Sequence, residues 1–100
     1  MEQDIRYIYS EFNESATRIF FSLFNEFRNE TGKLERDGNE NSFQVLKGRY
    51  LKVLRYRLEE RAGQFIDKCN SQDTQGRLRI SFTDKITYFG KEFIRKSALL

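Results

Sequence analysis

The chain has 100 residues and a formal net charge of +3, and it contains neither histidine nor proline. A chain of this length has room for one hydrophobic core, so we expect a single domain over residues 1–100. Without histidine, the commonest general base and the imidazole metal ligand are missing, and the single cysteine, Cys69, allows no intrachain disulfide. We expect no catalytic site, no metal, no cofactor and no small-molecule substrate, in a protein of a reducing intracellular compartment, cytoplasmic or nuclear.

The distribution of charge and apolar residues also argues against a membrane-spanning protein. The longest uncharged apolar run, residues 19–25, is far shorter than the roughly 20 residues that cross a bilayer. Charge is uneven along the chain, because residues 1–41 hold nine acids and five bases whereas residues 42–100 hold six acids and thirteen bases. The basic part either pairs with the acidic first segment or faces an acidic partner.

The first segment, about residues 2–31, shows apolar residues at steps of three and four, which is typical of an amphipathic helix. The residues of this stripe are Ile5, Ile8, Tyr9, Phe12, Ala16, Ile19, Phe20, Leu23 and Phe27. The following GKLERDGNEN stretch is polar, contains two glycines and has no periodicity, so we expect a connecting loop.

A second helix is predicted over about residues 42–70, with Asn41 as its N-cap. Its apolar stripe consists of Phe43, Leu46, Tyr50, Val53, Leu54, Leu58, Ala62, Phe65 and Cys69. Two stripes of similar length joined by this ten-residue polar loop indicate a long antiparallel helical hairpin.

The C-terminal segment favours a third, shorter helix over about residues 83–96. We expect residues 78–80 to be extended, and Ser81 with Asp84 to form the cap of the helix that follows. An alternative is a β-hairpin that pairs residues 78–82 with residues 85–89, but no type I′ turn pair lies between them. The predicted fold class is therefore all-α.

Four apolar residues lie off or at the margins of these stripes, and they are candidates for an oligomer interface. They are Tyr7, Phe21, Phe24 and Ile66. A hairpin with one short third helix leaves such residues uncovered, which favours a second subunit or a protein partner.

The second helix also carries a dense set of cations, which are the candidate contacts to a partner or to nucleic acid. These are Lys47, Arg49, Lys52, Arg55, Arg57 and Arg61. Residues 47–57 contain no acid, so they could neutralise several phosphates. At 100° per residue, however, the cations spread around the helix, and Arg57 and Arg61 fall near the apolar seam, where a guanidinium more often bridges to a neighbouring helix or subunit.

Residues 42–96 resemble the helical domain of subunits of GINS, the tetrameric accessory complex of the replicative helicase. The residues that carry the resemblance are Arg49, Tyr50, Leu51, Leu54, Arg57, Leu58 and Arg61, with residues 81–93 in the place of the family's short helix. The resemblance implies an interaction subunit in a DNA replication assembly, with the arginines at subunit contacts.

The leading hypothesis is a non-enzymatic helical module that self-associates or joins a larger assembly. The alternative is a small basic nucleic-acid-binding protein that uses residues 47–61.

Overall fold

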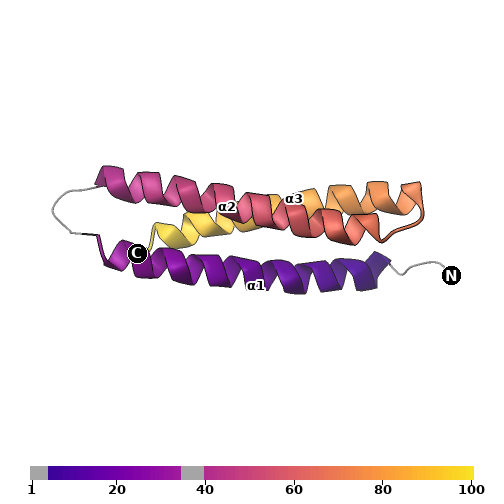
Figure 1. The fold of residues 1–100 in the computed structure, drawn as a ribbon, viewed down its shortest axis with the longest axis horizontal. Helices are drawn as coiled ribbons and strands as arrows, with labels where there is room; N and C mark the ends of the chain where they lie inside the picture. The colour runs from indigo at the N-terminus through magenta and orange to yellow at the C-terminus, as the bar shows by residue number, and fades with distance from the viewer. Residues whose placement is uncertain (1–4, 35–39) are drawn as a thin grey trace.

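The computed structural model describes residues 5–34 and 40–100, and it is an elongated bundle of three helices measuring 59 × 18 × 17 Å. The helices are α1 (Ile5–Gly32), α2 (Glu40–Asp67) and α3 (Gln72–Ser97). They lie side by side and run up, down and up, so that α1 and α3 are parallel and α2 is antiparallel to both (Figure 1). The described residues contain no strand. The all-α prediction and the antiparallel α1–α2 hairpin are confirmed.

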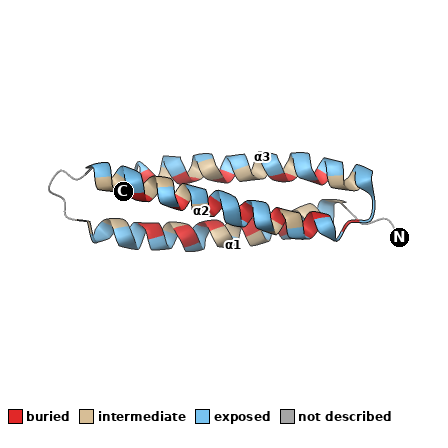
Figure 2. Cartoon of the chain, turned by 45° about the horizontal axis from the view of Figure 1, so that its top comes forward, coloured by how far each residue is buried: buried red, intermediate tan, exposed pale blue. Residues whose placement is uncertain are grey.

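The core follows the apolar stripes that the sequence predicts. Every third or fourth residue of each helix faces the bundle axis, and Figure 2 shows the buried residues along the inward side of the three helices. The fully buried side chains with the largest volumes are Phe12, Leu23, Phe27, Leu54, Leu58, Leu78, Phe82 and Phe93. Aromatic rings also join the helices. Phe12 of α1 stacks on Phe82 of α3, and the ring centroids are 4.1 Å apart.

The prediction of a short third helix is wrong in its boundary. The helix α3 begins at Gln72, about eleven residues earlier than expected, and Ser71 is its N-cap. Residues 78–80 are therefore helical and not extended, and the β-hairpin alternative fails as well. Ser81 and Asp84, the expected cap, lie inside the helix. The physical reason is that Leu78 and Phe82 continue the buried stripe of the helix at steps of four.

The ends of the other two helices differ less from expectation. The helix α2 begins at Glu40, so Asn41 is already helical and is not the N-cap. It ends at Asp67 and not at residue 70, and the polypeptide then turns into α3. The expected start of the first helix at residue 2 lies outside the described residues.

A third helix of 26 residues covers more apolar surface than the sequence interpretation allowed. Ile66, expected at an interface, is 6% exposed and belongs to the core. Phe24 is half-buried and packs edge-on against Phe93 of α3, with ring centroids 5.4 Å apart. The full-length α3 thus provides the third layer that these two residues require, within one copy of the chain.

Candidate functional site

An open groove of about 390 Å³ lies between α2 and α3. Residues of α1 take no part in it. The apolar part of its lining consists of Leu51, Leu54, Ile86, Gly90 and Ile94. Leu54 is fully buried and forms the floor, whereas Leu51 and Ile86 are half-buried and Ile94 is largely exposed. The groove is therefore an apolar depression that solvent reaches.

Helical spacing explains why these residues converge. On α2, Leu51, Leu54 and Arg55 are three and four residues apart, so they share one side of the helix. On α3, Ile86, Gly90 and Ile94 follow at steps of four. A side chain is missing at Gly90, and a Cβ atom placed there would have no neighbour within 4 Å. The groove is open at this point because none of the described residues fills it.

Charged and hydroxyl side chains form the rim of the groove. They are Arg55 and Glu59 on α2 and Thr83, Thr87 and Lys91 on α3. Arg55 Nε donates a hydrogen bond of 2.9 Å to Glu59 Oε1, one turn further along the helix. This pair is exposed, so it adds little stability. The carboxylate of Glu59 lies at one end of the groove, and Lys91 lies toward the other end.

The six predicted cations do not form one surface. Lys47 is half-buried, with its amino group 5.9 Å from the centroid of the Phe43 ring. Arg61 is also half-buried, and its Nε donates a 2.9 Å hydrogen bond to Ser15 Oγ of α1. The predicted bridge of a guanidinium to a neighbouring helix thus exists at Arg61, but its acceptor is a hydroxyl and not a carboxylate.

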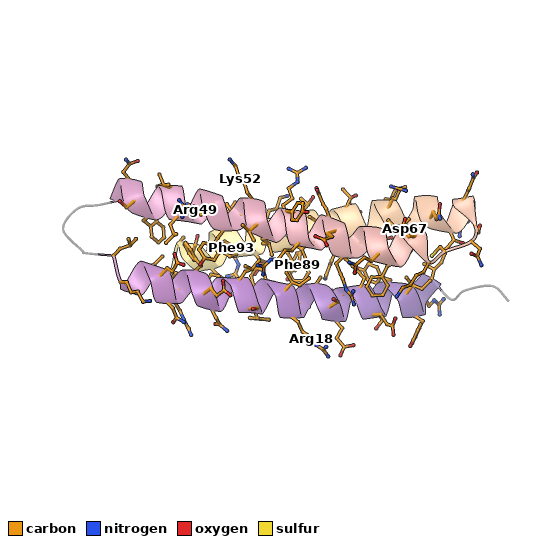
Figure 3. The ribbon with its side chains drawn as sticks, in the orientation of Figure 1. Arg18, Arg49, Lys52, Asp67, Phe89 and Phe93 are labelled. Atoms are coloured by element: carbon orange, nitrogen blue, oxygen red, sulfur yellow. The ribbon has the colours of Figure 1, made fainter. Side chains whose placement is uncertain are left out.

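The remaining cations are exposed but point in different directions. Lys52 points away from the bundle (Figure 3), and Arg57 is exposed as well. Arg49 lines a separate hollow of about 260 Å³, together with Glu30 and Leu34, where α1 and α2 meet. Of the six, only Arg55 lines the groove between α2 and α3.

The predicted interface residues of α1 lie apart from the groove. Tyr7 is largely exposed, and a hydrogen bond with Glu11 raises the pKa of its hydroxyl. Phe21 is 47% exposed and contacts Phe20, while the amino group of Lys96 lies 5.1 Å from its ring centroid. Both residues are available to a partner, and neither of them lines either of the two hollows described above.

Sequence interpretation missed the groove. Its residues belong to two helices, and those on α3 all lie within the predicted helix of residues 83–96, so the missing information was how α2 and α3 pack against each other. One available signal was the four-residue spacing of Ile86, Gly90 and Ile94, which places all three on one side of that helix.

Two classes of site are missing from the described part of the chain. No group of three or more cysteine, aspartate or glutamate side chains there is arranged to hold a metal ion. Nor does any helix within residues 5–34 and 40–100 have the length and apolar character needed to cross a membrane.

Comparisons with protein-family models, with curated proteins and with solved structures find no match to this chain.

Proposed function

We propose that this protein is a non-enzymatic interaction module whose binding surface is the groove between α2 and α3. The observation that carries the proposal is an apolar depression, lined by Leu51, Leu54, Ile86 and Ile94, that no segment of the described chain covers. Grooves between two helices bind an amphipathic helix by accepting its apolar face. The groove lining covers residues 83–94 of α3, which is about 17 Å of helix at 1.5 Å per residue, or about three turns of a partner.

The nucleic-acid alternative receives less support from the arrangement of charge. Phosphate binding requires cations that converge on one path. Here Lys47 and Arg61 lie against aromatic rings and α1, and Arg55 is paired with Glu59. The GINS resemblance stays a prediction, and a helix-binding surface on α2 and α3 agrees with the subunit role that it implies.

Titration with synthetic helical peptides tests the proposal. The isotopically labelled protein would receive amphipathic peptides of about 18 residues, one acidic, one basic and one neutral, and also a peptide of residues 72–97. We expect at least one peptide to shift the methyl signals of Leu51, Ile86 and Ile94.

Glycine substitutions supply the matched control. Gly90→Met fills the groove, whereas Gly76→Met adds the same side chain to α3 outside the groove lining. Both positions have open space, with no atom within 4 Å of the added Cβ, so both variants are expected to fold. Peptide binding should disappear in the first variant and persist in the second. No shift with any peptide, or equal loss in both variants, would contradict the proposal.

A further inference from the structure

The outward face of α3 carries a row of residues with an apolar residue at each end, a threonine at the centre, and an acid and a base on opposite sides of it. The row consists of Ile80, Asp84, Thr87, Lys91 and Ile94. Steps of three and four place these residues on one side of the helix. Ile80 is 68% exposed and Ile94 is 48% exposed, and they lie seven residues before and seven residues after Thr87. Two large apolar side chains are thus repeated at equal distances from a central threonine.

The charged members of the row have no ion-pair partner in the described chain. The ion pairs of α3 join Arg77 to Asp73 and Arg95 to Glu92, which leaves Asp84 and Lys91 exposed and unpaired within residues 5–34 and 40–100. Asp84 precedes Thr87 by three residues and Lys91 follows it by four. An acid and a base therefore lie on opposite sides of the same centre.

An antiparallel copy of the same helix complements this row. When a two-fold axis passes beside Thr87, Ile80 of one copy lies opposite Ile94 of the other. Asp84 lies opposite Gly90, one residue from Lys91, whose long side chain can reach the carboxylate. Each contact occurs twice, as a two-fold symmetric interface requires. An unlike-charge pair and an apolar pair then form on each side of the axis.

The row also borders the candidate groove, because Thr87, Lys91 and Ile94 line it. A second copy of α3 laid across this surface would reach the half-buried Leu51 and Ile86. We infer that the partner of the groove is a second copy of this chain, with the two α3 helices packed antiparallel about Thr87. This inference rests on the function proposed above and names the partner of that site.

A polyanion or an acidic helix fits the same surface less well. Glu59 lies on the groove rim, and Asp84 is exposed beside Thr83 of that rim. Glu59 is paired with Arg55, whereas the carboxylate of Asp84, unpaired among the described residues, would repel an acidic ligand at this end of the groove. A partner helix that places a base near Asp84 and an acid near Lys91 meets no such repulsion. A second, antiparallel copy of α3 has its charges in that order.

A charge-swap experiment tests the inference. In Asp84→Lys, both symmetric contacts become base against base, and in Lys91→Glu both become acid against acid. Sedimentation equilibrium from about 5 to 500 µM should show the wild type as a dimer, and each variant alone should dimerise at least tenfold more weakly. An equimolar mixture of the two variants restores both unlike pairs, so it should form a heterodimer of nearly wild-type affinity.

A disulfide at the two-fold axis gives an independent readout. Thr87→Cys should cross-link two copies on mild oxidation, whereas Gln72→Cys at the start of α3 should not, because the axis is far from it. The native Cys69 is buried, which limits background cross-linking.

The outcomes separate the two proposals. A wild type that remains monomeric at 500 µM, or a mixture of variants that fails to associate, overturns the inference. If the groove nevertheless binds one of the synthetic peptides, the proposed function stands with a different partner. If no peptide binds either, both proposals fail.

Discussion

The hydroxyl of Tyr50 donates a hydrogen bond of 2.8 Å to Oε1 of Glu30 and so ties α2 to the last turns of α1. The ring of Tyr50 is buried against Phe27, whereas Glu30 is exposed, so the bond lies at the edge of the core. Burial, followed by the hydrogen bond and the negative charges of Glu30 and Glu26, raises the pKa of Tyr50 from 10 to about 12. All these effects disfavour the tyrosinate form.

The first prediction concerns stability at high pH. The pKa of Tyr50 is higher in the folded state than in the unfolded state. The contribution of Tyr50 to the free energy of unfolding is therefore complete below pH 10 and is lost as the pH rises toward 12. The free energy of unfolding falls between pH 9 and pH 11, and this fall should be about 1 kcal/mol larger in the wild type than in Tyr50→Phe. At pH 7 the same variant should be less stable by about 1 kcal/mol, because one hydrogen bond is missing. Urea unfolding at the three pH values measures both effects, and parallel losses in the two proteins would contradict the prediction.

The second prediction distinguishes the two candidate starts of α3. Ser71 Oγ accepts a hydrogen bond of 3.4 Å from the backbone N–H of Thr74, as an N-cap does. We expect Ser71→Ala to destabilise the protein by about 1 kcal/mol. Ser81→Ala, inside the helix, should be neutral or slightly stabilising, because alanine is the better helix former. A larger loss at Ser81 than at Ser71 would mean that the helix begins where the sequence motif suggested.

The contrast between Ser71 and Ser81 shows where sequence interpretation succeeded and where it failed. The periodic stripes predicted the end of α1 and both ends of α2 to within a few residues, since long amphipathic segments leave little ambiguity. In α3, the short alternation of Leu78, Arg79 and Ile80 resembles a strand, and a capping-box spacing at Ser81 occurs by chance. Only the packing of Leu78 in the core shows that this segment is helical.

The candidate site was less predictable than the fold. Individual cations of α2 could be identified, but which of them face solvent depends on where α1 packs. Lys47 lies over Phe43, four residues earlier on the same helix, whereas the hydrogen bond of Arg61 to Ser15 of α1 requires the three-dimensional structure. The groove itself depends on the register between α2 and α3, which the sequence alone does not specify.

The third prediction concerns Arg61, which links two helices. Its guanidinium bonds to Ser15 Oγ at 2.9 Å and to Gln64 Oε1 at 2.6 Å, and its central carbon lies 5.0 Å from the ring centroid of Phe65. We expect Arg61→Met to cost about 1 kcal/mol, whereas Arg57→Met, at an exposed position, should change stability by less than about 0.5 kcal/mol.

A double-mutant cycle separates the hydrogen bond to Ser15 from the contact with Phe65. Combining Arg61→Met with Ser15→Ala should give a coupling energy of about 0.5 kcal/mol or more. Arg61→Lys should also be destabilising, because an ammonium group cannot stack as a planar guanidinium does. Strict additivity in the cycle would show that the hydrogen bond to Ser15 contributes nothing in solution.

The fourth prediction concerns Gly63, which lies inside α2, where glycine is unfavourable. A Cβ atom at this position would have no neighbour within 4 Å, so no close approach of another helix requires a glycine. Gly63→Ala should therefore stabilise the protein by about 0.5–1 kcal/mol, because alanine loses less backbone entropy on folding. Gly32→Ala, at the last residue of α1, is the control and should gain less, since the last turn of a helix frays. Urea unfolding at neutral pH measures both variants. A loss of stability at Gly63 would mean that a second chain packs in solution against this position of α2, which does not line the groove.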